Sequence, residues 1–144
     1  MFTRLTQLPH VETAALASLA RGEGFRFLDR LIAEWHEGVR FDGPGERLIG
    51  AFNRDRLVAI GGLNRDPYAG SPHIARLRRL YVAPDRRRDG LGRRLVASQL
   101  DGDNGQFKVV RLKAPDVAAA AFYDAIGVTR IDNEDATHVV RRDA

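Results

Sequence analysis

The segment from residue 76 to residue 94, RLRRLYVAPDRRRDGLGRR, constrains the fold more than any other part of the chain. It predicts an apolar strand, a short turn at Pro84, a run of arginines, and two glycines that open a helix. The start of a helix carries unpaired backbone N–H groups and the positive end of the helix dipole, so it favours an anion. Gly90 and Gly92 leave room for a bulky anion to approach the backbone. We therefore predict a loop that binds a diphosphate group.

The distribution of charge supports a local anion site. The chain has 23 Lys and Arg against 19 Asp and Glu, a net charge of +4. Positive charge gathers in residues 76–94 and again at 141–142, while acidic residues are scattered elsewhere. This concentration fits a localised phosphate site better than a long groove for nucleic acid. The arginines around the predicted loop are Arg86, Arg87, Arg88, Arg93 and Arg94.

Length and composition exclude several other classes of protein. The chain of 144 residues is long enough for one domain with a single core. It has no apolar run near the ~20 residues of a membrane span, and its N-terminus, MFTRLTQLPH, lacks the apolar segment of a secretory signal. We therefore expect a cytoplasmic protein without a membrane partner. With no cysteine and four scattered histidines, we also expect no metal.

The pattern along the chain predicts an α/β fold with one mixed sheet flanked by helices on both faces. Apolar residues at helical or alternating spacing, bounded by glycines, prolines and turn residues, separate the elements. The order is strand, two helices, three strands, helix, strand, helix and two strands. The predicted strands are Phe2–Thr6, Arg47–Phe52, Leu57–Leu63, His73–Val82, Phe107–Leu112, Val128–Ile131 and Thr137–Arg141. The predicted helices begin at Pro9, Phe27, Leu91 and Val117, and end near Gly22, Gly38, Gly102 and Ile126.

Two motifs within this order resemble those of the GNAT family of N-acetyltransferases. Arg87-x-x-Gly90-x-Gly92 is similar to the family's (Gln/Arg)-x-x-Gly-x-(Gly/Ala) signature, and it follows an Arg-Leu-Tyr-Val strand as is typical there. The segment AAAFYDAIGV, residues 119–128, resembles the family's second motif, an alanine-rich helix that carries Phe-Tyr. The hairpin RLIGAFNRDRLVAIGGL is similar to the family's second and third strands. The resemblance covers the whole chain and implies one GNAT-like domain over residues 1–144.

The resemblance implies an acyltransferase that moves an acetyl group from acetyl-CoA to a primary amine by direct attack on the thioester. The diphosphate would lie on backbone N–H groups of residues 87–93, and the pantetheine arm would pair with the exposed backbone of β-strand residues 80–82. The N–H of Val82 would stabilise the oxyanion, and Tyr123 would protonate the departing thiolate. The implied acetyl-CoA contacts are Leu80, Tyr81, Val82, Arg87, Arg88, Asp89, Gly90, Leu91, Gly92, Arg93, Asp116 and Tyr123.

The chain departs from the family pattern at three positions. The family often has glycine and a basic residue where this chain has Arg88 and Asp89, and an acid beside a diphosphate is mildly unfavourable. Asp116 replaces an asparagine; it can cap the following helix but cannot donate a side-chain hydrogen bond to pantetheine.

The general base is left open. The central strand carries no carboxylate, so the candidates are His73, Asp66 in the preceding loop, or ordered water.

The sequence leaves the acceptor open. The residues that could bind it are Phe25, Glu34, Trp35, His36, Glu37, Asp66 and Tyr68. The acids among them could attract a cationic amine, or they could belong to a solvated helix face.

Three other functions are alternatives to acetyl transfer. A non-catalytic acyl-CoA-binding protein would keep the same loop. A basic nucleic-acid module lacks a supporting motif. A dinucleotide-binding fold would need a third glycine where Leu95 stands. The sequence does not define the oligomeric state, and it is compatible with a homodimer.

Overall fold

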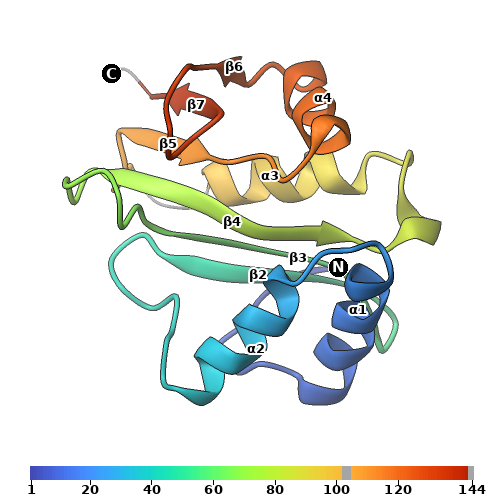
Figure 1. The fold of residues 1–144 in the computed structure, drawn as a ribbon. Helices are drawn as coiled ribbons and strands as arrows, with labels where there is room; N and C mark the ends of the chain where they lie inside the picture. The colour runs from blue at the N-terminus through green and yellow to red at the C-terminus, as the bar shows by residue number, and fades with distance from the viewer. Residues whose placement is uncertain (102–104, 143–144) are drawn as a thin grey trace.

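The computed structural model describes residues 1–101 and 105–142, and within them the strands form one mixed sheet (Figure 1). The seven strands lie in the order β1-β2-β3-β4-β5-β7-β6. All neighbours are antiparallel except β4 and β5, which run parallel. The α/β fold predicted from the sequence is confirmed. The elements are β1 (Phe2–Arg4), α1 (His10–Gly22), α2 (Phe27–His36), β2 (Arg47–Asn53), β3 (Arg56–Arg65), β4 (Ile74–Val82), η1 (Pro84–Arg86), α3 (Leu91–Asp101), β5 (Val109–Leu112), α4 (Val117–Ala125), β6 (Thr129–Arg130) and β7 (His138–Arg141).

Helices cover both faces of the sheet, because the strands alternate their apolar side chains between them. On one face, Leu48 and Ile60 pack with the buried sides of α1 and α2. On the other face, Ile49 and Ala59 pack with Leu91 and Leu95 of α3. A third cluster joins α3 and α4 to β4 and β5; its buried members are Leu63, Ala75, Leu77, Val96, Phe107, Val110, Leu112, Tyr123 and Val128.

Element ends shift from the predicted ones where strand pairing decides them. The hairpin turn is two residues long, because Asn53 pairs with Arg56. β3 continues to Arg65, into the segment predicted as a loop, because it pairs there with β4. Near the C-terminus the strands are shorter than predicted: β5 begins at Val109 rather than Phe107. The predicted helix stop at Gly102 lies outside the described residues.

The two central strands diverge, and this divergence creates the space for a site. β4 pairs with β5 only through its first three residues, Ile74 to Arg76. From Leu77 to Val82 it continues alongside β3 alone. A bulge lies in this second half: Gly61 of β3 faces both Arg79 and Leu80, and Arg79 has a φ of 60°. Bulges bend a strand and increase its twist, so β4 turns away from β5.

None of the helices in the described part of the chain has both the length and the apolar character needed to cross a membrane. Within the same residues, no group of three His, Asp or Glu side chains gathers as a metal site would require.

Candidate functional site

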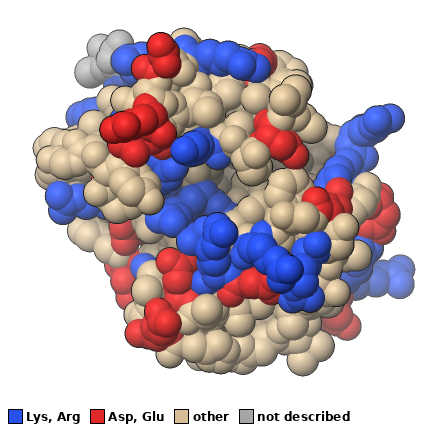
Figure 2. Space-filling model, in the orientation of Figure 1, with Lys and Arg blue, Asp and Glu red and all other residues tan. Residues whose placement is uncertain are grey.

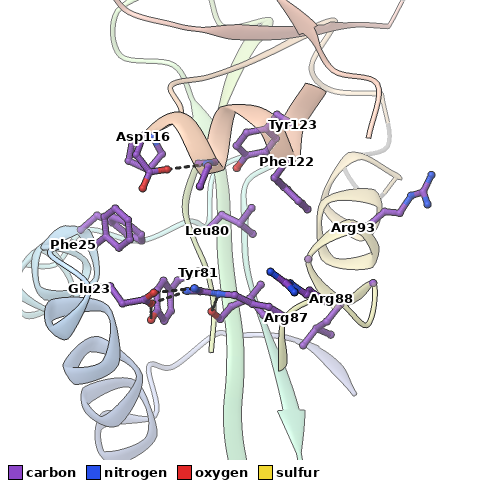
Figure 3. Close-up of a pocket in the computed structure, with 18 residues that line it drawn as sticks. Glu23, Phe25, Leu80, Tyr81, Arg87, Arg88, Arg93, Asp116, Phe122 and Tyr123 are labelled. Carbon is purple, nitrogen blue, oxygen red and sulfur yellow. Dashed lines mark hydrogen bonds and ion pairs between the residues drawn. The ribbon is translucent and has the colours of Figure 1, made fainter. Parts of the chain in front are cut away.

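A cavity of about 670 Å³ occupies the gap that opens where β4 leaves β5 (Figure 3). Its volume falls within the roughly 300–1,000 Å³ of typical ligand sites. Four segments far apart in the sequence enclose it: the end of α1 with the start of α2, the last residues of β4, the loop before α3, and α4. The lining residues are Glu23, Phe25, Phe27, Leu80, Tyr81, Val82, Arg87, Arg88, Gly90, Leu91, Gly92, Arg93, Pro115, Asp116, Ala118, Ala119, Phe122 and Tyr123.

The edge of β4 presents an unpaired backbone amide to this cavity. Ala83 donates its N–H to the carbonyl of Val58 on β3 at 2.8 Å. Because successive amides of an extended strand point to opposite sides, the N–H of Val82 points away from β3, toward the open edge. The carbonyl of Val82 points the same way and accepts a hydrogen bond from Nε of Arg87 at 3.1 Å. The open edge therefore offers an amide donor in the cavity wall.

The loop before α3 turns its backbone with two left-handed residues, Arg88 with a φ of 70° and Gly90 with a φ of 85°. Successive amides in such a conformation form a concave surface that suits an anion. The first turn of α3 adds its own unpaired N–H groups and the positive end of its dipole. One of these amides is already engaged, since Leu91 donates its N–H to the carboxylate of Asp89 at 3.1 Å. That bond, more than Arg86, holds the pKa of Asp89 below its usual range.

Arg87 is fixed in place by an acid that sequence reasoning missed. Its two Nη atoms donate to the carboxylate of Glu23 at 2.9 and 2.7 Å, and Tyr81 also donates its hydroxyl hydrogen to Glu23. The bond from Arg87 lowers the pKa of Glu23, and burial together with Glu23 raises the pKa of Tyr81. This triad joins the end of α1 to the loop and to β4 (Figure 3). Its residues lie up to 64 positions apart, and no local pattern connects them.

Tyr123 forms the opposite wall of the cavity. Its side chain is 6% exposed and packs against the rings of Phe122 and His138, with centroids 5.1 and 5.6 Å away. Its hydroxyl group points toward the cavity (Figure 3). Burial raises the pKa of Tyr123 above that of an ordinary tyrosine. Its hydroxyl group is therefore protonated at neutral pH.

Asp116 lies at the other end of α4. Its Oδ1 accepts a hydrogen bond from the N–H of Ala119 at 2.8 Å, so the predicted helix cap is present. Its carboxylate is therefore engaged in capping even though the residue lines the cavity.

The structure brings most of the predicted site residues together, and it separates two. Of the twelve predicted acetyl-CoA contacts, all but Asp89 line the cavity, and Asp89 lies in the same loop. The side chain of Arg93 points away from the cavity (Figure 3). His73 is exposed and immediately precedes β4, about 25–30 Å from Val82 at ~3.3 Å per residue. Asp66 is fully buried beside Arg111 and Arg76, at 2.9 and 3.6 Å. Neither His73 nor Asp66, the two candidate bases, lines the cavity.

Comparison with known proteins identifies the family. Residues 44–130 match a family model described as an acetyltransferase (GNAT) domain. The chain belongs to the GNAT acetyltransferase family. The GNAT motifs predicted from the sequence, Arg87-x-x-Gly90-x-Gly92 and the helix with Phe122 and Tyr123, both lie in the matched range and both line the cavity. Acetyl transfer is therefore the general activity of this class of domain.

Solved structures support the GNAT fold over nearly the whole chain. A candidate acetyltransferase from Exiguobacterium sp. 255-15 superposes with a TM-score of 0.87 and 22% identity, covering 98% of this chain and 92% of its own. An aminoglycoside 6'-acetyltransferase type Ii gives 0.70 and 17%, covering 100% and 98%. The ribosomal-protein-S18-alanine N-acetyltransferase from Escherichia coli gives 0.67 and 18%, covering 100% and 96%. Identities this low establish the fold alone. No curated protein matches the sequence significantly.

Proposed function

We propose that this GNAT domain transfers an acetyl group from acetyl-CoA to a primary amine, and that residues 1–144 form one such domain. One observation carries the proposal: a single cavity is lined by the open edge of β4, the loop before α3 and the side chain of Tyr123. These are an amide donor, an anion-binding loop and a proton donor. Direct acetyl transfer from a thioester to an amine needs these three functions together.

The residues present suit acetyl-CoA, which supplies an activated acetyl group when bound. The loop amides from Arg87 to Arg93 would hold its diphosphate group, supported by the dipole of α3. Gly90 keeps the backbone of that loop approachable, because the nearest atom to a Cβ at this position would be Nη1 of Arg94, 3.6 Å away. The free backbone of β4 near Leu80 and Val82 would bind the pantetheine arm, because pairing with backbone needs no particular side chain.

The amide of Val82 would stabilise negative charge on the reacting carbonyl oxygen. It is fixed by the sheet, since the next residue is bonded to β3. A donor that is already oriented requires no rearrangement at the moment of reaction, and it is worth more in a cavity that excludes water.

Tyr123 would supply the proton that the departing sulfur needs. A thiol has an ordinary pKa near ~8.5, below the ~10 of tyrosine. The pKa of Tyr123 is raised further by burial, so its phenolic oxygen holds a proton at neutral pH and can deliver it to the thiolate. The amine is not assigned a side-chain base, because His73 and Asp66 do not reach the cavity; ordered water can remove its proton.

The substitution Tyr123→Phe tests this assignment. No hydrogen bond to the Tyr123 hydroxyl comes from any described residue, so phenylalanine fits the same space with little structural cost. We expect kcat to fall by roughly 10²–10⁴-fold, the usual contribution of a general acid, while the Kd for acetyl-CoA stays nearly constant. Tyr81→Phe is the matched control: it lines the same cavity, but its hydroxyl is bound to Glu23. Full turnover by Tyr123→Phe would remove Tyr123 from the mechanism.

A non-catalytic acyl-CoA-binding protein is the second candidate, because the same cavity and loop would serve it. It differs in one measurable way: acetyl-CoA would bind, and no amine would stimulate release of CoA.

A further inference from the structure

Four arginines lie on the face of β4 and β5 that α1 and α2 also occupy. Leu77 points to the α3 side, so its neighbours Arg76 and Arg78 point to the α2 side. Arg79 contacts Glu34 of α2, and Arg111 of β5 pairs with Arg76 in the sheet. Figure 2 shows lysine and arginine atoms across the middle of this face, beside the hollow between its upper and lower parts.

Three of the four arginines have carboxylate partners. Asp66, fully buried, binds Arg111 at 2.9 Å and lies 3.6 Å from Arg76. Glu34 binds Arg79 at 2.7 Å. Both acids are thus already neutralised by arginines. They were candidates to attract a cationic amine, and the structure leaves neither of them available for that role.

Arg78 is the exception. Its side chain is partly buried, and no residue in the described ranges gives its guanidinium a hydrogen bond or an ion pair. Burial lowers its pKa, and the charges of Arg79 and Arg76 lower it further; Glu34 acts in the opposite direction. A partly buried guanidinium without a protein partner loses part of its hydration and gains no hydrogen bond or ion pair in return. An external anion would remove that cost.

Arg78 does not itself line the cavity, but it lies on the same unpaired edge of β4 that enters it. It precedes Val82, whose amide would hold the reacting carbonyl oxygen, by four residues, a distance of about 13 Å along the strand at ~3.3 Å per residue. From Leu77 onward, the edge of β4 toward β5 is unpaired. A molecule whose reactive amine lies near Val82 can therefore meet the extended Arg78 side chain with a second group at its far end, several bonds from the amine.

We propose that the acceptor is an amine that also carries a carboxylate, and that Arg78 binds this carboxylate. The proposal rests on the acetyltransferase function proposed above and names its acceptor class. A guanidinium matches a carboxylate with two parallel hydrogen bonds, so the contact provides orientation as well as charge. Acceptors with several positive charges are disfavoured beside Arg78, the one arginine of the four that has no carboxylate partner in the described ranges.

Matched acceptors that differ only in charge give the first test. Release of CoA is measured at saturating acetyl-CoA with ω-amino acids of increasing chain length, their carboxamides, and diamines of equal length. We expect the amino acids to have kcat/KM values about ten- to a hundredfold above those of the carboxamides, the value of one charge-assisted bond. Diamines should be the poorest of the three. Preference for diamines would overturn the proposal.

Variants of Arg78 give the second test. Arg78→Gln should raise KM for the amino acid about ten- to a hundredfold and leave the carboxamide unchanged, and Arg78→Lys should recover part of the loss. The thermal midpoint of Arg78→Gln should equal or exceed that of the wild type, because an unpaired charge is removed. Arg30→Gln, an exposed arginine of α2, is the control and should change neither acceptor. Equal losses for both acceptors would contradict a carboxylate contact.

Binding of acetyl-CoA, measured separately by calorimetry, distinguishes the two levels of failure. If acetyl-CoA binds and diamines are acetylated while amino acids are not, the proposed function stands and the carboxylate site is wrong. If no amine in the panel is acetylated, the transferase proposal fails and the acceptor proposal fails with it.

Discussion

Gly90 and Gly92 belong to one motif, but the structure gives each a different reason to be glycine. Gly90 has a φ of 85°, and a Cβ there would meet nothing closer than Nη1 of Arg94 at 3.6 Å. Gly92 lies in helix α3, where a Cβ would lie 3.3 Å from two ring carbons of Phe122 and 3.5 Å from Val82. Backbone conformation requires the first glycine, and close packing of α3 on α4 and β4 requires the second.

This difference predicts how alanine acts at each position. Gly92→Ala must push Phe122 or α3 by a few tenths of an ångström, an overpacking that costs about 1–3 kcal/mol. Gly90→Ala costs about 1–2 kcal/mol through its left-handed conformation, without a clash. Either loss corresponds to a fall of several degrees, at roughly 2–4 °C per kcal/mol. The two variants are therefore similar in stability and differ in cause.

A double-mutant cycle with Phe122→Leu separates the causes. The smaller side chain gives a Cβ at position 92 the room it lacks, so we expect Gly92→Ala and Phe122→Leu to couple favourably by at least about 1 kcal/mol in urea unfolding. The affinity for acetyl-CoA lost in Gly92→Ala should be partly restored as well. Gly90→Ala and Phe122→Leu should be additive within ~0.5 kcal/mol. Additivity at Gly92 would refute the packing explanation.

Two further predictions concern single carboxylates: Asp89 beside the anion-binding loop, and Asp124 on α4. Asp89→Asn keeps an oxygen that can accept the hydrogen bond from the N–H of Leu91, but it removes a negative charge beside the anion site. Calorimetry should therefore give a Kd for acetyl-CoA that is roughly two- to fivefold tighter, about the effect of one charge at a helix terminus, and the gain should shrink at high salt. Weaker binding by Asp89→Asn would contradict this. The hydrogen bond from Arg130, and to a smaller extent the one from His138, holds the pKa of Asp124 at about 2. Because that pKa is depressed in the folded state, the stabilisation is present above pH ~4 and is lost as pH falls toward 2. The thermal midpoint of Asp124→Asn should therefore change less between pH 4 and pH 2.5 than that of the wild type; equal changes would show that Asp124 is not responsible.

The order of elements and most of the cavity wall could be predicted because their signals are local. Apolar spacing defined the helices, and Asp116 marked a helix start that the structure bears out with a hydrogen bond. The Arg87-x-x-Gly90-x-Gly92 motif located the loop. These features depend on residues a few positions apart, which a sequence displays directly.

What the sequence could not provide depends on register and on distant contacts. The bulge at Arg79 arises because two residues of β4 face Gly61, and an arginine in a strand gives no sign of it. Glu23 binds Arg87 from 64 positions away. The burial of Asp66 between two arginines likewise depends on strands brought together by the fold. For the same reason, the sequence suggested acids for a cationic acceptor, whereas the structure leaves a free arginine.

Titration of the purified protein with acetyl-CoA in a calorimeter is the most direct test of the central claim, that the amides after β4 hold the diphosphate of an acyl-CoA. The wild type should bind acetyl-CoA with measurable heat and gain about 2.7 kcal/mol of stability at a ligand concentration of 100 Kd. Acetylpantetheine, which lacks the diphosphate, should bind far more weakly. If the folded protein shows no heat with acetyl-CoA, or binds both compounds equally, the loop does not have the role assigned to it.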